Sequence, residues 1–304
     1  MIITAVVVTY NRKDYLKKLL ELYDYFIDKP DNIIIVNNNS DDGTCEILNE
    51  WINKKSSYSK HVINMNENLG GSGGFYNGIK KALDINSDWI YVSDDDAYPN
   101  KDVFKIFNDF IEVNKDILDD IAAICGTVIN CGDIDIEHRR RIKKGRFFIK
   151  EYNVDKEEYN NNFELNLFSY VGTMINSKYL KKFGLTEKDY FIYYDDTEHS
   201  LRLNKYGKII CIPRAGIVHD TKKELNGDIS WKTYYGYRNR LLMIKKHYEG
   251  GYFIRECILD RLKSFKRIIK GNFDEARLIN KGIKDATNNI KGIDKIYKPG
   301  WKVE

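Results

Sequence analysis

Apolar runs typical of strands alternate with segments of helical periodicity from residue 2 to residue 93. The strand-like runs cover residues 2–9, 33–36, 61–66 and 89–93, and the helical segments cover residues 12–26, 44–52 and 74–83. This alternation predicts an α/β protein with a mostly parallel central sheet flanked by helices. Ligands of such sheets bind beyond the carboxyl ends of the strands. Polar or glycine-rich segments follow four of these runs, so we expect the functional site there.

Three consecutive aspartates, Asp94, Asp95 and Asp96, follow the apolar run at residues 89–92. Their mutual repulsion must be offset by a cation, by hydrogen bonds or by raised pKa values. On an extended segment Asp94 and Asp96 point to the same side, and hard divalent cations prefer carboxylate oxygens. A solvated acidic turn, closed by the proline at position 99, is the alternative interpretation. The surrounding segments favour a metal site.

Composition narrows the class of protein. A chain of 304 residues with 42% hydrophobic content can form one large domain with an appendage. No run of about 18 uncharged apolar residues occurs, and the first residues lead directly into a strand pattern, so we expect a cytoplasmic protein. Five cysteines without a C-x-x-C pair argue against a disulfide framework or a zinc knuckle. The net charge of +4 is too small to indicate nucleic-acid binding.

The positive charge is concentrated near the C-terminus. Residues 255–304 hold thirteen Lys or Arg and seven Asp or Glu, a surplus of six. We therefore expect a basic helical extension at residues 250–304 after a domain at residues 1–249. Apolar residues recur at helical spacing in the extension; they are Ile254, Ile258, Leu262, Phe265 and Ile269. This apolar stripe either packs on the body or binds an anionic membrane surface, and an oligomer-forming role is a further possibility.

Residues 133–166 interrupt the pattern. They contain the basic stretch at residues 138–144 and three asparagines at residues 160–162. We expect an irregular, mobile excursion here. It is either a surface insertion without a special role or a lid or substrate contact, as long loops of enzymes often are.

Five segments together resemble family-2 inverting glycosyltransferases of the A-type fold. They are TYNR at residues 9–12, VNNNSDDGT at 36–44, NLGGSGGF at 68–75, the aspartate triplet, and YDDTEHSLR at 194–202. The double-glycine element and the triplet are most similar to bacterial galactofuranosyltransferases. The resemblance covers roughly residues 2–245. It implies a metal-dependent enzyme that moves a hexose, such as galactofuranose from UDP-galactofuranose, to a glycan or lipid-linked acceptor in cell-surface polysaccharide synthesis.

A nucleotide-sugar donor carries a diphosphate whose charge rises as the glycosidic bond breaks, so a divalent cation is required. The resemblance implies that Asp94 and Asp96 bind Mn²⁺ or Mg²⁺, with the ribose as an alternative partner of Asp94. Asp95 is expected at the donor sugar or ribose. A neutral imidazole is a suitable third ligand, and the resemblance favours His219 in this role over a structural histidine.

The nucleotide pocket is expected to contain Thr9, Arg12 and Asn37. Many members of the family have aspartate where this chain has Asn37, and an amide can still accept from the base and donate to a carbonyl oxygen. Arg238 lies in the aromatic stretch at residues 231–239. That stretch is either a core face or a contact with the donor diphosphate or the acceptor, and we expect the second.

The glycines Gly70, Gly71, Gly73 and Gly74 open a predicted helix. Their backbone N–H groups would approach phosphate or sugar at the positive helix end. Close packing of the helix is the other interpretation. A dinucleotide oxidoreductase is disfavoured, because its glycine fingerprint should follow the first strand.

Asp195 and Asp196 precede a helical stretch and exceed what helix capping alone needs. An inverting transfer needs a carboxylate to take the proton of the acceptor hydroxyl. The family pattern indicates Asp196 as this base, with Asp195 as the runner-up. Two further functions stay open. One is a dTDP-rhamnose-dependent rhamnosyltransferase, and the other is a catalytically silent glycan-binding protein, which the intact acids disfavour.

Overall fold

The structure, a computed structural model, describes residues 1–146, 148–221 and 229–302. Its strands are β1 (Ile3–Thr9), β2 (Asn32–Asn37), β3 (Ser59–Asn64), β4 (Trp89–Asp94), β5 (Ala97–Pro99), β6 (Ile121–Asn130), β7 (Asp133–Ile134), β8 (Arg139–Lys144), β9 (Ile149–Asn153), β10 (Phe163–Leu165), β11 (Leu167–Phe168), β12 (Thr173–Asn176) and β13 (Lys208–His219). Its α-helices are α1 (Lys13–Leu22), α2 (Thr44–Asn53), α3 (Gly70–Asp84), α4 (Val103–Val113), α5 (Ser177–Phe183), α6 (Asp195–Asn204), α7 (Trp231–His247), α8 (Tyr252–Ile269) and α9 (Phe273–Thr287).

The strands of the large sheet follow the order β10-β13-β6-β12-β4-β1-β2-β3, with β5 beside β13 and β7 beside β6. β3, β2, β1 and β4 run parallel, and β12 lies antiparallel between β4 and β6. In this register Thr9 is opposite Asn37, and Val8 is opposite Asp94. The carboxyl ends of β1, β2 and β4 therefore meet at one edge, as the strand exits in the sequence predict.

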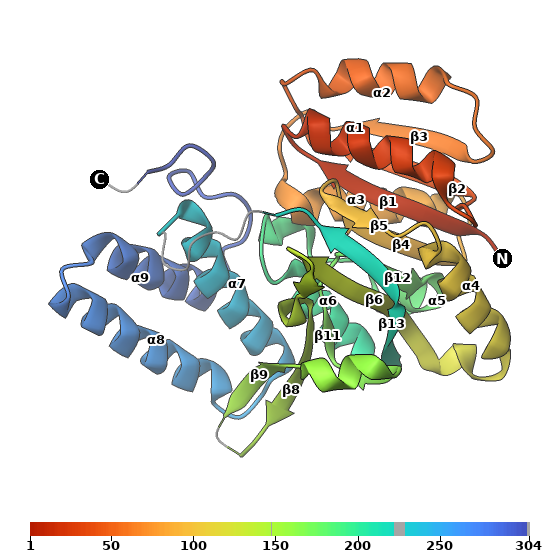
Figure 1. Ribbon diagram of the computed structural model, residues 1–304. Helices are drawn as coiled ribbons and strands as arrows, with labels where there is room; N and C mark the ends of the chain where they lie inside the picture. The colour runs from red at the N-terminus through yellow and green to blue at the C-terminus, as the bar shows by residue number, and fades with distance from the viewer. Residues whose placement is uncertain (147, 222–228, 303–304) are drawn as a thin grey trace.

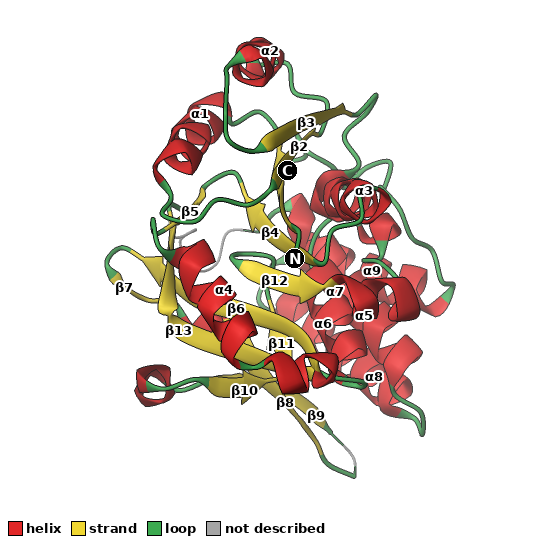
Figure 2. Cartoon of the chain, turned by 90° about the vertical axis from the view of Figure 1, so that its right-hand side faces the viewer, coloured by secondary structure: helices red, strands yellow, loops and turns green. Residues whose placement is uncertain are grey.

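Helices cover both faces of the sheet. Figure 2 shows α1 and α4 on one side of the strands and α3 and α5 on the other. Because alternate side chains of a strand point to opposite faces, Ala5 and Val7 join the apolar core beneath α1 and α4, whereas Val6 and Val8 join the core beneath α3. Both faces are buried, as parallel strands require.

Helix α3 approaches β1 closely because it has glycines at the contact. A Cβ atom at Gly74 would lie 2.5 Å from Val8 Cγ1, and one at Gly78 would lie 2.3 Å from Val6 Cγ1. A Cβ at Gly73 would likewise meet the Leu69 side chain at 2.4 Å. Close packing of α3 on β1 therefore accounts for Gly74, whereas the Leu69 side chain at the start of the same helix accounts for Gly73.

The prediction of an irregular excursion at residues 133–166 is wrong. β8 pairs with β9 and with β11 in a small antiparallel sheet. Arg139, the first residue of β8, is fully buried, and its guanidinium donates to the backbone carbonyls of Gly126 and Val171. The buried guanidinium of Arg139 therefore anchors the basic stretch at residues 138–144. The Tyr252 hydroxyl also donates to the Gly145 carbonyl, at 2.7 Å, and joins the hairpin to α8.

The last three helices lie together at one side of the sheet (Figure 1). α7 and α9 share an apolar core with Tyr190 that includes Leu241, Ile279 and Ile283. Among the described residues, no helix combines the length and the apolar character needed to cross a membrane. The helical extension is present, and the domain boundary at residue 249 stays a prediction.

Candidate active site

Asp94, Asp96 and His219 come together at the carboxyl edge of the sheet. One possible ligand atom of each lies within 4.8 Å of those of the other two. Asp94 ends β4, and Asp96 lies in the turn that leads to β5. His219 ends β13 and pairs with Ala97 of β5. The β5–β13 pairing therefore brings a distant histidine beside the aspartates.

The three side chains suit a hard divalent cation. Asp96 Oδ1 lies 3.4 Å from His219 Nε2. Within the described part of the chain, neither Asp96 Oδ1 nor His219 Nδ1 has a hydrogen-bond partner, although both are buried. Buried polar atoms without partners are rare and need an explanation, and carboxylate oxygens beside an imidazole are ligands that Mn²⁺ accepts.

Thr9 and Arg12 support the middle aspartate. The Thr9 hydroxyl donates to Asp95 Oδ2 at 2.6 Å, and Arg12 Nη1 lies 3.4 Å from Asp95 Oδ1. Arg12 also forms an ion pair with Asp96. Because 47% of the Arg12 side chain is exposed, its guanidinium could also meet an anionic ligand. Thr9, in contrast, is buried, and its hydroxyl is used by the hydrogen bond to Asp95.

The pKa values of the triplet differ. Burial, together with the charges of Asp96 and Asp196, raises the pKa of Asp94 to about 7 against the opposing charges of His219 and Arg12. Burial also raises the pKa of Asp95 to about 7 against the effects of Thr9 and Arg12. Although burial acts in the same direction on Asp96, its neighbours His219 and Arg12 hold the pKa of Asp96 below its usual range. The negative charge of the triplet is thus favoured on Asp96, which faces both Arg12 and His219.

A strained segment leads into Asp195 and Asp196 at the start of α6. Phe191, Tyr193 and Tyr194 have φ values of 69°, 65° and 66°. Each such residue costs about 1–3 kcal/mol and persists only where the surroundings hold it. A carboxamide from α7 holds this segment: Asn239 Nδ2 lies 2.9 Å from the carbonyl oxygens of Tyr190, Ile192 and Tyr193.

The absence of a side chain at Gly70 allows the strained segment at residues 191–194 to lie against the start of α3. Gly70 has φ +72°, and a Cβ atom there would lie 1.9 Å from the Phe191 carbonyl oxygen. The Ser72 N–H of the first turn of α3 donates to that oxygen at 3.2 Å. The glycine-rich turn therefore seats the segment before the acids. Gly71 has no neighbouring atom within 4 Å of a Cβ position, so it is the glycine of the predicted four with space beside it.

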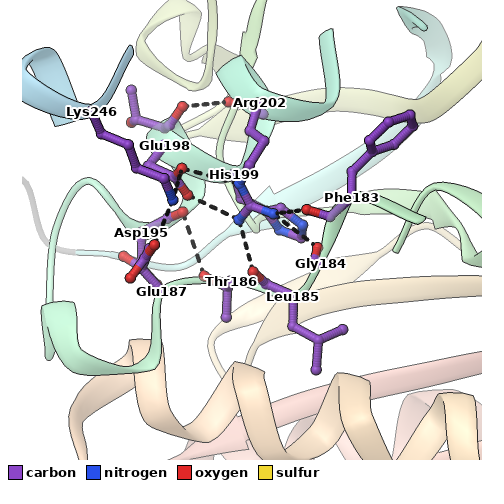
Figure 3. A network of polar contacts seen from close by, with 12 residues as sticks. Phe183, Gly184, Leu185, Thr186, Glu187, Asp195, Glu198, His199, Arg202 and Lys246 are labelled. Atoms are coloured by element: carbon purple, nitrogen blue, oxygen red, sulfur yellow. Dashed lines mark hydrogen bonds and ion pairs between the residues drawn. The ribbon is translucent and has the colours of Figure 1, made fainter. Parts of the chain in front are cut away.

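A polar network behind α6 fixes the helix (Figure 3). Arg202 pairs with the buried Glu198 at 3.0 Å and donates to the carbonyls of Phe183 and Leu185. Lys246 of α7 also pairs with Glu198, at 2.8 Å. The Thr186 hydroxyl reaches the Asp195 carbonyl at 3.5 Å. Breaking buried ion pairs of this kind costs much free energy, so the ion pairs of Glu198 fix the position of the first turn of α6.

The two acids have different surroundings. Burial and the charge of Asp196 raise the pKa of Asp195 to about 8. Burial also raises the pKa of Asp196, but the charge of Arg140 and hydrogen bonds from Thr197 oppose this rise. Thr197 N and Oγ1 donate to Asp196 Oδ1 at 2.5 and 3.0 Å, and Arg140 Nη2 donates to Thr197 Oγ1 at 2.8 Å. The charged form therefore has more support from its neighbours at Asp196 than at Asp195.

Two of the predicted donor-binding residues, Arg238 and Asn37, are buried and form hydrogen bonds within the protein. Arg238 is fully buried, and its guanidinium donates to the carbonyls of Tyr190 and Gly292. Its expected contact with the donor or acceptor is wrong, because a guanidinium without exposed surface cannot reach a ligand. Asn37 is buried at the end of β2 with Nδ2 bonded to Asn64 and Oδ1 to the Ser40 N–H. Its contact with the base stays a prediction and would use the second lone pair of Oδ1.

Sequence reasoning missed Arg140 and Asn239 as positioning residues. Arg140 lies in a basic stretch without periodicity, and β8 brings it to α6 only through tertiary pairing. Asn239 follows Arg238 directly in a helix whose aromatic residues dominate the pattern. An uncharged amide inside a helix that carries an apolar face is the one signal that could have indicated Asn239.

Asp195→Asn is expected to stabilise the metal-free protein at neutral pH. The folded-state pKa of about 8 lies above the ordinary aspartate value, so between the two values unfolding releases a proton and becomes easier as the pH rises. Asparagine removes this penalty. Thermal melting in a chelator should show a gain of about 1–3 kcal/mol at pH 7 and little change near pH 4. Asp41→Asn, at an exposed site, is the control; an equal gain there would contradict the prediction.

Comparison with known structures gives the class of the fold. S. aureus TarS 1-349 in complex with UDP-GlcNAc superposes with a TM-score of 0.61 at 16% identity, over 95% of this chain and 82% of that one. GalNAc-T7 with UDP, GalNAc and Mn²⁺ superposes with a TM-score of 0.64 at 14% identity, over 95% of this chain and 56% of that one. These likenesses confirm the predicted A-type glycosyltransferase fold.

The family follows from the sequence comparison. Residues 4–181 match the family described as Glycosyl transferase family 2, and the chain belongs to this family. Galactofuranosyltransferase GlfT1 of Mycolicibacterium smegmatis is 36% identical over 98 residues, which are 32% of this chain and 31% of the relative. The chain thus matches about a third of the length of this curated relative. The predicted family and its likeness to galactofuranosyltransferases are confirmed.

Proposed function

We propose that the protein is a metal-dependent inverting glycosyltransferase that moves galactofuranose from UDP-galactofuranose to a glycan or lipid-linked acceptor. The observation that carries this proposal is the juxtaposition of two acid groups. The cluster Asp94–Asp96–His219 lies near Asp195 and Asp196, close enough for the charge of Asp196 to raise the pKa of Asp94. Similarity to GlfT1 favours galactofuranose as the sugar, and cell-surface polysaccharide synthesis is the process that we infer.

Each group has a role in this proposal. Asp94, Asp96 and His219 would hold Mn²⁺ or Mg²⁺, and a cation bound there would supply positive charge for the departing diphosphate. Asp196 takes the proton of the acceptor hydroxyl while that oxygen attacks the anomeric carbon from the side opposite the diphosphate. Attack from that side inverts the anomeric centre. Arg140 and Thr197 favour the ionised form of Asp196 against the effect of burial, and Asp195 remains the second candidate for the base.

A nucleotide-sugar panel tests the proposal. The full chain would be mixed with UDP-galactofuranose, UDP-galactopyranose, UDP-GlcNAc, GDP-mannose and dTDP-rhamnose, each with Mn²⁺ or with a chelator. We expect the largest thermal shift and the fastest nucleotide release with UDP-galactofuranose and Mn²⁺. A preference for dTDP-rhamnose would favour the rhamnosyltransferase alternative. Absence of binding to every donor would favour a catalytically silent protein.

Arg140→Gln is expected to move the acid limb of the pH profile. Removing the positive charge raises the pKa of Asp196, so less of the base is ionised at a given pH. The acid limb of kcat/KM should shift upward by about one pH unit, with activity recovering at higher pH. Arg140→Lys keeps the charge and should shift the limb less. A loss by the same factor at every pH would show that Arg140 has only a structural role.

A further inference from the structure

Helix α8 presents its apolar side to solvent. The members of the apolar stripe, Ile254, Ile258, Leu262, Phe265 and Ile269, are each more than half exposed. The opposite side of the helix buries Glu256, Asp260 and Ser264. The interpretation that the stripe packs on the body is therefore wrong. An exposed apolar surface that runs along a whole helix is unusual for a soluble domain and marks an interaction site.

Buried polar contacts fix this orientation. Arg240 of α7 pairs with Glu256 at 2.8 Å and with Asp260 at 2.5 Å. Asn280 of α9 donates to the Ser264 hydroxyl at 2.8 Å. Rotating α8 to bury the stripe would expose both acids and leave the largely buried Arg240 unpaired, which is strongly destabilising. The outward direction of the stripe is thus specified by the neighbouring helices.

The acidic side chains of α8 lie on its buried side, and basic side chains lie on its exposed side. The helix has two acids and five bases, and both acids, Glu256 and Asp260, face the protein interior. Arg261 and Lys266 flank the stripe on either side at helical spacing, and Lys270 follows at the end of the helix. All three are exposed. No ion pair engages them within the described residues 1–146, 148–221 and 229–302, whereas Arg267 pairs with Glu275.

We propose that α8 docks on an anionic lipid membrane, with its apolar stripe between the headgroups and its flanking bases near lipid phosphates. An apolar face, a cationic border and the absence of an exposed acid on α8 are the features of helices that lie in a membrane interface. A second copy of this chain would cover the apolar stripe but would bring the bases of two helices together. Charge complementarity therefore favours the lipid surface.

Co-sedimentation of the full chain with vesicles tests the docking. The vesicles would contain phosphatidylcholine with or without phosphatidylglycerol, at low and high ionic strength. We expect strong binding to anionic vesicles at low ionic strength and weaker binding when salt is added. The triple variant R261Q/K266Q/K270Q should bind about 10²-fold more weakly, because each base near such a surface contributes about fivefold.

The apolar contribution needs its own variant. I258S/L262S/F265S should lose binding even to anionic vesicles at low ionic strength, with an unchanged or higher melting temperature because the replaced side chains are exposed. Matched controls lie away from α8. I27S/I52S/V113S replaces other exposed apolar residues, and K54Q/K55Q/K181Q removes three other exposed lysines. Both controls should bind vesicles like the parent chain.

Three results would overturn the proposal. The first is equal binding to neutral and anionic vesicles at low ionic strength. The second is full binding by the apolar variant, which would leave only a diffuse electrostatic attraction. The third is a dimer in light scattering that the apolar variant converts to a monomer, without vesicle binding by the parent chain; the stripe would then join two copies. Donor turnover in solution is measured separately, so failure of the docking is distinguishable from failure of the proposed enzymatic function.

Discussion

Replacing Asp196 with asparagine is expected to lower sugar transfer by about 10²–10⁴-fold, the usual contribution of a general base. Donor binding should change little, because the amide keeps the shape of the side chain and the Thr197 N–H and hydroxyl can still donate to its oxygen. Single-turnover kinetics with a saturating donor would measure the chemical step, and a thermal shift with UDP and Mn²⁺ would measure binding. The two effects should separate.

Asp195→Asn is the matched control for this change. It removes a neighbouring acid of the same helical turn, whose pKa of about 8 keeps much of it protonated near neutral pH. If Asp195→Asn abolishes transfer and Asp196→Asn stays active, the roles of the two acids are reversed. If Asp196→Asn loses donor affinity by the same factor as it loses rate, Asp196 belongs to the donor or metal site.

Asp96→Ala is expected to abolish transfer together with the metal dependence of donor binding. Asp96 lies between His219 and Arg12 and carries the most acidic carboxyl of the triplet. Loss of an outer-shell partner alone weakens metal binding by about 10–100-fold, so we expect the loss of a direct ligand to exceed about 100-fold. The parent chain should gain melting temperature with Mn²⁺ and UDP together, and the variant should not.

Asp95→Asn provides the comparison within the same three residues. The Asp95 carboxylate accepts from Thr9 and faces Arg12 rather than His219. The variant is expected to keep a metal-dependent shift, even if its donor affinity falls. Calorimetric titration of Mn²⁺ into each variant without donor would separate the effect on metal binding from the effect on donor binding. An unchanged metal-dependent shift in Asp96→Ala would remove Asp96 from the metal site.

Local patterns were sufficient to predict which strand ends meet at the candidate site. The strand periodicity located the ends of β1, β2 and β4, and the parallel register brings Thr9, Asn37 and Asp94 to one edge. The joining of His219 to the aspartates was expected from the family resemblance. Its physical cause, the short pairing of β5 with β13, involves a three-residue strand without a periodic signal of its own.

Tertiary polar contacts could not be predicted in the same way. Helical spacing shows that Ile258 and Leu262 share one face of α8, but the contacts of Arg240 and Asn280 determine that this face points outward. Arg238 is an equivalent case, because a cation inside an aromatic stretch suggests a ligand contact until its carbonyl partners are known. Buried ion pairs override hydrophobic periodicity where a partner from another helix lies in the right place.

The support of the segment before Asp195 and Asp196 reaches almost to the end of the described chain. Arg238 donates to the Gly292 carbonyl, and the Gly292 N–H donates to the Asp189 carbonyl at 2.6 Å. During synthesis the sheet can form as soon as its strands have left the ribosome, since domains begin to fold from the N-terminus. Asn239 and Ser72 hold part of the strained segment that precedes Asp195, but the contacts of Gly292 complete its support only after residue 292 has emerged. A growing chain therefore possesses the folded sheet before the support of the two acids is complete, and we expect a translation product that stops before residue 292 to be compact but less active than the full chain.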